Sequence, residues 1–467
     1  FNVLHPGHLR LLRFARECGD RLVVAVNSDR VAGKGAHVPQ SLRLESVQSI
    51  SQVSDVFIVD EPIADLIARL RPDIVVKGKE HEHAFNPELE ALVKYGGRLL
   101  FSSGETVFSS IDLLNKEVQQ IKLKSISLPD EYMLRHKIGF ERLRELVHGF
   151  ASMKVCVVGD LIVDEYITCE PLGMSREDPT IVVTPIDSTR FVGGAGIVAA
   201  HAAGMGAQVQ FVSLSGVDAT RDFAIRELEA VGVTSHMLID ESRPTTLKQR
   251  YRCQGKSMLR VSHLHQSAIS VVLQERFIEH VERAIEGANV LVFSDFNYGC
   301  LPQPVVERIT AMAKTRGVLL AADSQSSSQV GDIARFVGMD LLTPTEHEAR
   351  LGTRDRDAGL VVLAETLLRQ AMARNVLLKL GEEGLLIHAG EDRDSRWMTD
   401  RVGALNIAPR DVSGAGDSLL IASALTLACG GDIWEAACLG SLAAAIQVGR
   451  IGNLPIRSEE LLHELNQ

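Results

Sequence analysis

Asp411-Val412-Ser413-Gly414-Ala415-Gly416-Asp417, in the last third of the chain, places three small residues directly before a carboxylate. Small residues let backbone N–H groups crowd around an anion, and a helix that begins there adds its positive N-terminal end to the anion site. Asp417 can serve as a general base beside that site, or as a structural helix cap. An anion site next to a general base is what transfer of a phosphoryl group from ATP to a hydroxyl requires.

The sequence on both sides of this heptad alternates short apolar runs with amphipathic stretches, which is typical of an α/β domain with a parallel sheet. Buried strands are predicted at residues 155–160, 209–212, 290–293, 318–322 and 376–380. Residues 164–192 and 245–262 are short, polar and rich in β-formers. We expect these two segments to form a small lid sheet over the mouth of the main sheet.

The same alternation occurs at the other end of the chain, with strands predicted at 21–26, 56–59 and 73–76 and helices at 9–15 and 63–70. Residues 116–150 interrupt it and predict a linker and then an amphipathic lead-in helix. The predicted domains are therefore 1–115 and 151–467, joined by 116–150. Because Phe1 is not Met and the chain opens at what reads as a strand end, we expect a truncated N-terminus that lacks its first strand.

Composition limits the functional class. A chain of 467 residues with 45% apolar residues predicts two or three domains with real cores, and a net charge of −11 argues against nucleic-acid binding. Local basic residues and backbone amides must then hold phosphorylated substrates. No apolar run is long enough for a membrane span. The seven cysteines include no Cys-x-x-Cys pair, so we expect buried free thiols and a cytoplasmic location.

His5-Pro6-Gly7-His8 lies between a predicted strand end and a predicted helix, which puts two imidazoles at a helix N-terminus. Imidazole donors and the helix dipole can stabilise charge on a triphosphate as it breaks. A chance pair and a zinc site are the alternatives, and the zinc site lacks further ligands nearby.

The stretch from Phe1 to His8 resembles the signature of the nucleotidyltransferase superfamily of cytidylyltransferases and related adenylyltransferases, although that family has Phe-Asp where this chain has Phe1-Asn2. The resemblance implies a Rossmann-like domain. It also implies attack of a phosphate or phosphorylated alcohol on the α-phosphorus of a nucleoside triphosphate, with pyrophosphate released. His5 and His8 would stabilise the breaking triphosphate. The residues at matching intervals, implied as phosphate contacts, are Lys34, Arg43, Lys77 and Ser109.

Residues from about 150 to 467 resemble the ribokinase-like sugar kinases. The matching motifs are Gly159-Asp160 with Asp164, Gly193-Gly194-Ala195-Gly196, Thr343-Pro344 with Glu348, Lys379-Leu380-Gly381, the heptad, and Gly452. The resemblance implies ATP as substrate, with Gly414, Ala415 and Gly416 as anion hole and Asp417 as base. Implied nucleotide-side residues are Lys379, Gly381 and Gly452. Asp164, Gly193 and Gly194 would bind the sugar, and Glu348 would hold Mg²⁺ through water.

A finer resemblance, to the heptose 7-phosphate kinases, involves Arg243-Pro244-Thr245, Lys248, Arg250 and Ser294-Asp295-Phe296. It implies that Lys248, Arg250 and Asp295 bind the sugar phosphate. A kinase and a nucleotidyltransferase in one chain resemble the bifunctional enzymes of ADP-heptose synthesis, in which the kinase usually comes first. Implied partners are small-molecule sugar phosphates and nucleotides, with no nucleic acid and no membrane. The lid sheets of ribokinase-like enzymes often pair two subunits, which allows a homodimer.

Four residues depart from the heptose kinase pattern. They are Ile197 for Asn, Tyr298 for Lys, Gln325 for Lys and Thr345 for Asn. Each exchange removes a polar or charged group that the family turns toward its substrates. Three alternatives therefore stay open: an altered sugar as substrate, activation of another sugar or polyol phosphate with CTP, and a degenerate kinase that only binds sugar phosphates.

Overall fold

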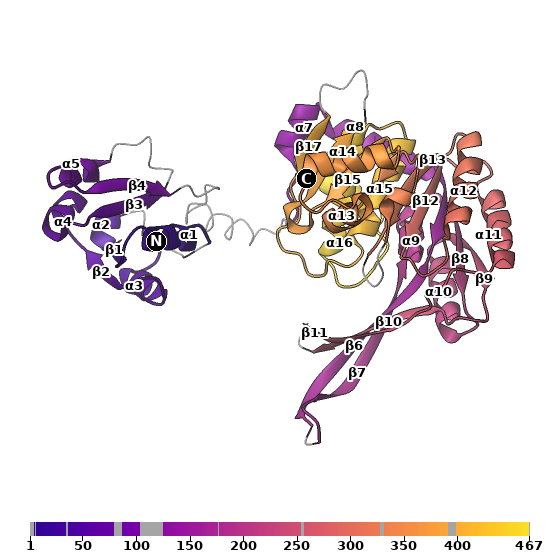
Figure 1. The fold of residues 1–467 in the computed structure, drawn as a ribbon, viewed down its shortest axis with the longest axis horizontal. Coiled ribbons are helices and arrows are strands. Elements are labelled where there is room, and N and C mark those ends of the chain that lie inside the picture. Colours follow the sequence, from indigo (N-terminus) through magenta and orange to yellow (C-terminus); the bar gives the residue numbers. More distant parts are fainter. Residues whose placement is uncertain are drawn as a thin grey trace. The chain divides into compact units, whose positions relative to one another are not determined.

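The structure is a computed structural model, and its described residues are 4, 6–33, 36–78, 86–102, 125–175, 177–253, 256–326, 331–390 and 398–466. The chain forms two compact units, Phe1–Lys124 and Ser125–Gln467 (Figure 1). Helices α7 (Asp130–His136) and α8 (Phe140–Gly149), from the predicted linker and lead-in region, lie in the second unit. In each described part of the chain, every helix is too short or too polar to cross a bilayer.

The first unit is an α/β structure with parallel strand pairs. Strand β1 (Val23–Asn27) pairs with β2 (Asp55–Val59), and β3 (Ile74–Gly78) pairs with β4 (Arg98–Ser102). The three predicted strands are present, but within the described residues they belong to two separate pairs. The helices are α1 (Pro6–Glu17), α2 (Asp29–Ala32), α3 (Gln40–Gln48), α4 (Ile63–Leu70) and α5 (Pro87–Val93).

The second unit is built on a large, mostly parallel sheet whose described strands follow the order β17-β16-β15-β14-β13-β12-β5-β8-β9. Its predicted strands are β5 (Lys154–Gly159), β8 (Gln208–Ser215), β12 (Val290–Asp295), β13 (Leu319–Ser324) and β15 (Asn375–Lys379). Four further strands were not predicted from the sequence, namely β9 (Val233–Ile239), β14 (Leu341–Leu342), β16 (Leu385–Ala389) and β17 (Thr399–Val402). Strands β16 and β17 are antiparallel additions at one edge.

Helices cover both faces of this sheet, because its strands are apolar on both sides. Along β5, Val155 and Val157 belong to one core cluster, and Cys156 and Val158 to the other. The first cluster includes residues of α7, α8, α9 (Ala195–Gly204), α10 (Ala219–Ala230), α15 (Ala415–Ala428), α16 (Ile433–Val448) and α17 (Ser458–Leu465). The second includes residues of α11 (Val271–Ala284), α12 (Gln303–Thr315), α13 (Glu346–Thr353) and α14 (Leu360–Gln370). This doubly wound architecture confirms the predicted fold class.

The predicted lid is a separate sheet that projects from the body of the second unit (Figure 1). Its described strands, in the order β11-β10-β6-β7, are β6 (Leu161–Met174), β7 (Ile181–Gly194), β10 (Thr246–Cys253) and β11 (Lys256–His263). Strand β6 starts two residues after β5 ends, so the lid grows directly out of the carboxyl edge of the main sheet. Ligands of open α/β sheets bind at that edge.

Candidate active site

The heptad forms the start of helix α15. Gly414 adopts a left-handed backbone with φ of 76° as the N-cap, and a Cβ there would approach Asn453 Oδ1 to 2.6 Å. Glycine at this position therefore suits both the turn and the close packing. Asp417 lies in the first turn of α15 and is buried. The first N–H groups of α15 have no acceptor within the helix, which suits them to an anion.

Lys379, at the end of β15, lies against this helix start. A Cβ at Gly416 would lie 3.1 Å from the Lys379 Nζ. The same ammonium forms an ion pair with Asp323, at 3.0 Å from Oδ1 and 2.9 Å from Oδ2. Burial alone would lower the pKa of Lys379, but the charges of Asp323, Glu348 and Asp417 outweigh it and raise this pKa. Lys379 is therefore a fixed cation beside the predicted anion hole.

The carboxyl group of Asp417 is held in a strongly perturbed state. Burial, together with the negative charge of Asp323, raises its pKa to about 7, although Lys379 acts in the opposite direction. Gln325, directly after β13, donates a hydrogen bond from Nε2 to Asp417 Oδ1 at 3.2 Å. A carboxyl group with a pKa near neutrality can take up a proton from a hydroxyl and release it again at physiological pH.

Asp164, on the lid strand β6, lies against Gly193, the first glycine of the predicted substrate loop. A Cβ at Gly193 would lie 2.5 Å from Asp164 Oδ2, and Gly194, with φ of 58°, leads into α9. Burial raises the pKa of Asp164, against the opposing charges of Arg250 and Lys248. Arg250 Nη2 lies 3.4 Å from Asp164 Oδ1. The predicted sugar-binding residues Asp164, Gly193, Gly194, Lys248 and Arg250 are therefore brought together.

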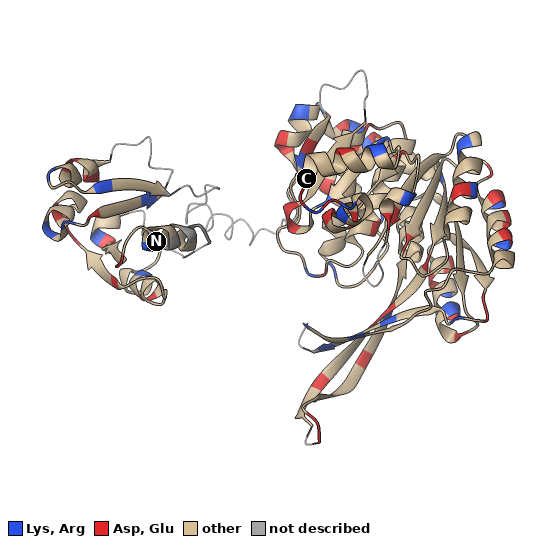
Figure 2. Cartoon of the chain, in the orientation of Figure 1, with Lys and Arg blue, Asp and Glu red and all other residues tan. Residues whose placement is uncertain are grey.

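Strand β10 contributes the basic side of this region. Figure 2 shows Lys and Arg along β10 and Asp and Glu on β6 and β7 of the same sheet. Lys248 is the register partner of Asp164, and Arg250 is the partner of Tyr166. Arg250 Nη1 also donates to Ser413 Oγ of the heptad at 3.2 Å, so it links the lid to the anion-hole turn.

Asp411 and Gly452 stabilise the turn that precedes Asp417. The Asp411 carboxylate accepts hydrogen bonds from Tyr166 Oη at 2.9 Å, Ser413 N at 3.0 Å and Gly452 N at 3.2 Å. Gly452 has φ of 77°, and a Cβ there would collide with the Phe191 ring of β7. The structure thus places Gly452 beside the anion-hole turn and the lid. Its role on the nucleotide side stays a prediction.

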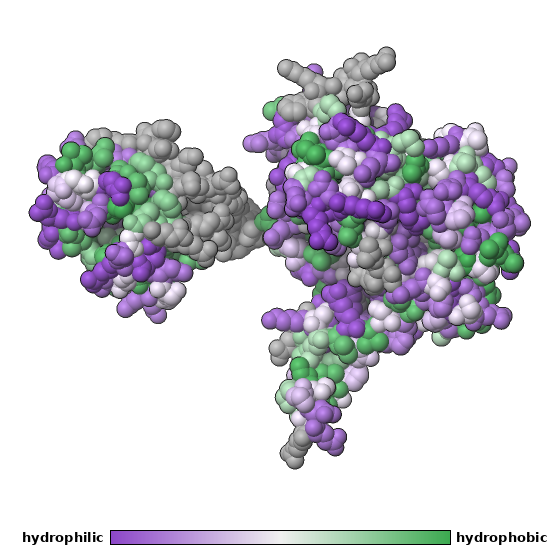
Figure 3. All heavy atoms as spheres, in the orientation of Figure 1, coloured by the Kyte–Doolittle hydropathy of each residue, from purple (hydrophilic) through white to green (hydrophobic). Residues whose placement is uncertain are grey.

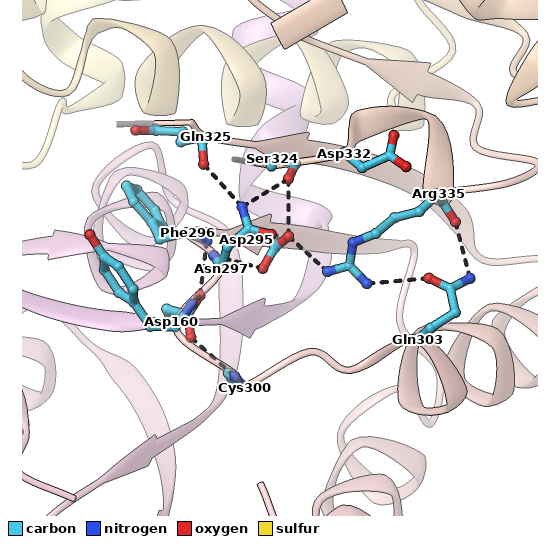
Figure 4. A network of polar contacts seen from close by, with 12 residues as sticks. Asp160, Asp295, Phe296, Asn297, Cys300, Gln303, Ser324, Gln325, Asp332 and Arg335 are labelled. Atoms are coloured by element: carbon cyan, nitrogen blue, oxygen red, sulfur yellow. Dashed lines mark hydrogen bonds and ion pairs between the residues drawn. The ribbon is translucent and has the colours of Figure 1, made fainter. Parts of the chain in front are cut away.

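Asp295 belongs to a buried polar network below the site (Figure 4). Its carboxylate accepts hydrogen bonds from Arg335 Nη2 at 2.7 Å, from Ser324 Oγ at 3.0 Å and from Asn297 N at 3.1 Å. These contacts fix the loop after β12 to the end of β13. The observed role of Asp295 is to order this loop, and substrate binding by Asp295 stays a prediction.

Glu348 is the predicted magnesium contact and Gly381 a predicted nucleotide-side residue, and both roles stay predictions. Glu348 is buried at the start of α13, where its carboxylate accepts from Thr345 N at 2.7 Å and Ser326 N at 3.1 Å. Gly381, with φ of 62°, turns the chain after β15 and leaves open space at its α-carbon. In the described ranges, no group of three or more His, Cys, Asp or Glu side chains could hold a metal ion by itself.

In the first unit, His5, Lys34 and Ser109 lie outside the described residues. His8 lies in the first turn of α1 and is half-buried. Arg43 is buried and donates to the carbonyl oxygens of Val38 at 2.8 Å and Asn27 at 2.9 Å. Lys77 forms an ion pair with Glu88 at 2.9 Å. Arg43 and Lys77 therefore stabilise the chain itself here, and phosphate contact by either stays a prediction.

The four departures have different structural consequences. Ile197 is buried in the core on α9, and Thr345 caps α13 with a reciprocal hydrogen-bond pair to Glu348. Gln325 contacts Asp417, and Tyr298 packs below Lys248. Three further residues of the candidate site were not predicted from the sequence: Asp323, Asn453 and Tyr166. The sequence signal that could have identified Asp323 is its position directly after the predicted strand 318–322, two residues before Gln325.

Comparison with sequence families gives two matches. The pfkB family carbohydrate kinase model matches residues 152–457, and the Cytidylyltransferase-like model matches residues 1–98. The chain is 32% identical over 321 residues to the bifunctional protein HldE of Desulfatibacillum aliphaticivorans, covering 68% of this chain and 64% of that protein. It is 29% identical over 322 residues to the bifunctional protein HldE of Helicobacter hepaticus, with the same coverage of 68% and 64%. The chain thus matches less than two thirds of the length of these relatives.

Solved structures of sugar kinases share the fold of the kinase part of the chain. Ribokinase from Thermotoga maritima is 22% identical, with a TM-score of 0.53, covering 68% of this chain and 100% of that chain. Phosphofructokinase-2 from Escherichia coli in complex with substrates and products is 17% identical, with a TM-score of 0.55 and coverage of 68% and 100%. Both likenesses confirm the ribokinase-like fold.

Proposed function

Because the chain belongs to the pfkB family of carbohydrate kinases, we propose that its second unit transfers the γ-phosphoryl group of ATP to a sugar hydroxyl. The observation that carries this proposal is the setting of Asp417, a buried carboxyl with a pKa of about 7 at a helix start beside Lys379. Asp417 takes the proton of the attacking hydroxyl. The amides of 414–416 and the Lys379 ammonium hold the charge of the phosphoryl group in transfer.

The proposed substrate is a sugar phosphate of the heptose 7-phosphate class, phosphorylated at its anomeric hydroxyl. Asp164 would accept hydrogen bonds from sugar hydroxyls, and Lys248 and Arg250 would bind its phosphate. Mg²⁺, when bound, neutralises charge on the ATP phosphates. Its ligands are mostly phosphates and water, so the single carboxylate of Glu348, held by two backbone amides, fits a contact through water.

Purified protein incubated with ATP, Mg²⁺ and a panel of sugar phosphates tests this kinase proposal. We expect ADP release that depends on D-glycero-D-manno-heptose 7-phosphate or a close relative, with a bisphosphate product visible by ³¹P NMR. ADP release at the same rate with and without every sugar phosphate in the panel contradicts the proposal.

For the first unit, we propose nucleotidyl transfer from ATP to a sugar 1-phosphate, which would give ADP-heptose together with the kinase. The match of residues 1–98 to the Cytidylyltransferase-like model and the place of His8 at the start of α1 support this proposal. Pyrophosphate release from ATP and from CTP, each with heptose 1-phosphate, tests it and identifies the base. Absence of release with both nucleotides contradicts it.

The pKa of Asp417 predicts the pH dependence of the kinase. Because the carboxylate form is the base, we expect kcat/KM for the sugar to rise with pH and to level off above about 7. Gln325→Lys places a cation beside Asp417, so it should lower this pKa by roughly one unit or more and move the rise to lower pH. Initial rates from about pH 5 to pH 8 measure both profiles. A flat wild-type profile, or the same midpoint in the variant, contradicts the assignment.

We further propose that the second unit forms a homodimer through its lid. Figure 3 shows apolar residues gathered on the lid sheet. Ile186 is 64% exposed and Leu172 63% exposed, and β7 and β11 are the edges of that sheet among the described strands. Exposed apolar patches and free strand edges favour association. The seven free cysteines support a cytoplasmic location for such an assembly.

Ile186→Lys should therefore convert the dimer to a monomer, because a charge at the paired lid surface must be desolvated. Size-exclusion chromatography with light scattering measures the mass. Leu134→Lys is the matched control, since Leu134 is 81% exposed on α7, outside the lid. A monomeric wild type, or a dimer that survives Ile186→Lys, contradicts the lid interface.

A further inference from the structure

Tyr166 brings the lid into contact with the anion-hole turn, residues 411–416. It lies on β6 two residues after Asp164, so both side chains are on the same face of that strand. The Tyr166 hydroxyl donates a hydrogen bond to Asp411 Oδ2 at 2.9 Å and lies 3.2 Å from Ser413 Oγ. One strand of the lid therefore carries both a predicted sugar-binding carboxylate and a hydrogen-bond donor to the turn.

Asp411 connects this contact to the backbone of the turn. Its Oδ1 accepts a hydrogen bond from Ser413 N at 3.0 Å, and its Oδ2 accepts one from Gly452 N at 3.2 Å in addition to the one from Tyr166. Residues 414–416, whose amides form the proposed anion hole, follow directly and are partly exposed. A carboxylate that is held by the lid and by two backbone amides therefore fixes the path of the chain into α15.

The ring of Tyr166 is held by contacts of its own. The guanidinium carbon of Arg250 lies 5.3 Å from the ring centre, and that of Arg252 lies 5.0 Å from it. Phe191 of β7 meets the ring edge-on, with 5.3 Å between the ring centres and 69° between the planes. These cation–π and edge-on contacts involve the ring and not the hydroxyl. Replacing the tyrosine by phenylalanine therefore removes its hydrogen bond to Asp411 and keeps the packing.

We propose that Tyr166 is a positioning residue for phosphoryl transfer, whose hydroxyl orients Asp411 and, through it, the amides of 414–416. This inference rests on the proposed kinase function, since those amides hold the phosphoryl group in transfer. An amide donor has to point at the position where charge develops, so a small displacement of the turn lowers the rate of transfer. In this role Tyr166 acts on the turn, whereas Asp164 and Arg250 act on the sugar phosphate.

Tyr166→Phe tests the positioning role. We expect kcat to fall about tenfold, as for the loss of one hydrogen bond to a charged group, with KM for the sugar phosphate within about twofold of wild type. The sugar KM should hold because Asp164 and Arg250 keep their neighbours. A purely structural role would lower the melting temperature and leave kcat of the folded protein unchanged. An unchanged kcat, or an effect confined to the sugar KM, overturns the proposal.

A double-mutant cycle with Asp411→Asn shows whether Tyr166 acts through Asp411. Asparagine has the size of aspartate but lacks its charge, so the carboxylate that Tyr166 orients is gone. We expect Tyr166→Phe to lower kcat about tenfold in the wild-type background and by less than about twofold in the Asp411→Asn background. The same factor in both backgrounds contradicts the proposal.

Tyr132→Phe is the matched control. Tyr132 is also buried, and its hydroxyl donates to the Trp434 carbonyl at 2.9 Å, so this variant should melt lower and keep its kcat. If wild type phosphorylates no sugar phosphate, the kinase proposal fails, and calorimetric binding of ATP with Mg²⁺ tests Tyr166 by itself. A Kd that rises about fivefold in Tyr166→Phe but not in Tyr132→Phe then upholds the positioning role. Equal Kd values in wild type and Tyr166→Phe, or no ATP binding by wild type, refute it.

Discussion

Asp417→Asn is expected to lower kcat for phosphoryl transfer by about 10²- to 10⁴-fold, the usual contribution of a general base. Asparagine keeps the size of the side chain and can still bond to Gln325, but it cannot take the proton of the sugar hydroxyl. Steady-state ADP release with saturating ATP and sugar phosphate measures the loss. Equal rates in wild type and variant would falsify the assignment of Asp417 as base.

Ser418→Ala controls for disturbance of the helix start, since the Ser418 hydroxyl donates to the Ala415 carbonyl one turn back at 2.9 Å. We expect nearly wild-type kcat from this control.

The pH dependence of folding stability is a second control. The raised pKa of Asp417 means that the folded chain keeps a proton that the unfolded chain has lost, so wild type loses stability as pH rises from about 4 to about 7. Asp417→Asn should lose less over that range, which thermal melts at acid and neutral pH measure.

The architecture could be predicted from the sequence where a local pattern determines it. Continuous apolar runs such as Val155–Val158 identify strands buried on both faces, and the polar β-rich segments identify the lid. Strand β14 has only two residues, Leu341–Leu342, and is too short to give a pattern. Strands β16 and β17 pair antiparallel at an edge, an arrangement that follows from their neighbours and not from their own residues.

The candidate site could be predicted where one short motif supplies both the backbone amides and the catalytic side chain, as in the turn from Gly414 to Asp417. Contacts between segments that are distant in the sequence could not be predicted. From the sequence, Gln325 was interpreted only as the loss of a family lysine, yet its side-chain amide donates a hydrogen bond to Asp417. Ile197 replaces a polar residue of the family, yet here it fills the core behind the substrate loop. Strand register and helix packing determine which neighbours such side chains contact, and these cannot be deduced from the identity of a single residue.

Lys379→Met should both destabilise the second unit and slow the kinase, because Lys379 is the ion-pair partner of the buried Asp323 and also lies against the start of α15. Without the ammonium, Asp323 is a buried and unpaired charge, and loss of one partner of such a pair costs about 3–5 kcal/mol of unfolding free energy. Urea unfolding measures this cost.

The double variant Lys379→Met with Asp323→Asn separates stability from catalysis. Removing both charges should restore most of the stability, since replacing a buried pair by neutral groups is often close to neutral. Activity should not return, because the cation that lies against Gly416 is still absent and the phosphoryl group in transfer loses its charge partner. Recovery of kcat/KM for ATP together with stability would make Lys379 a purely structural partner of Asp323. Recovery of stability alone assigns the Lys379 ammonium to the anion hole.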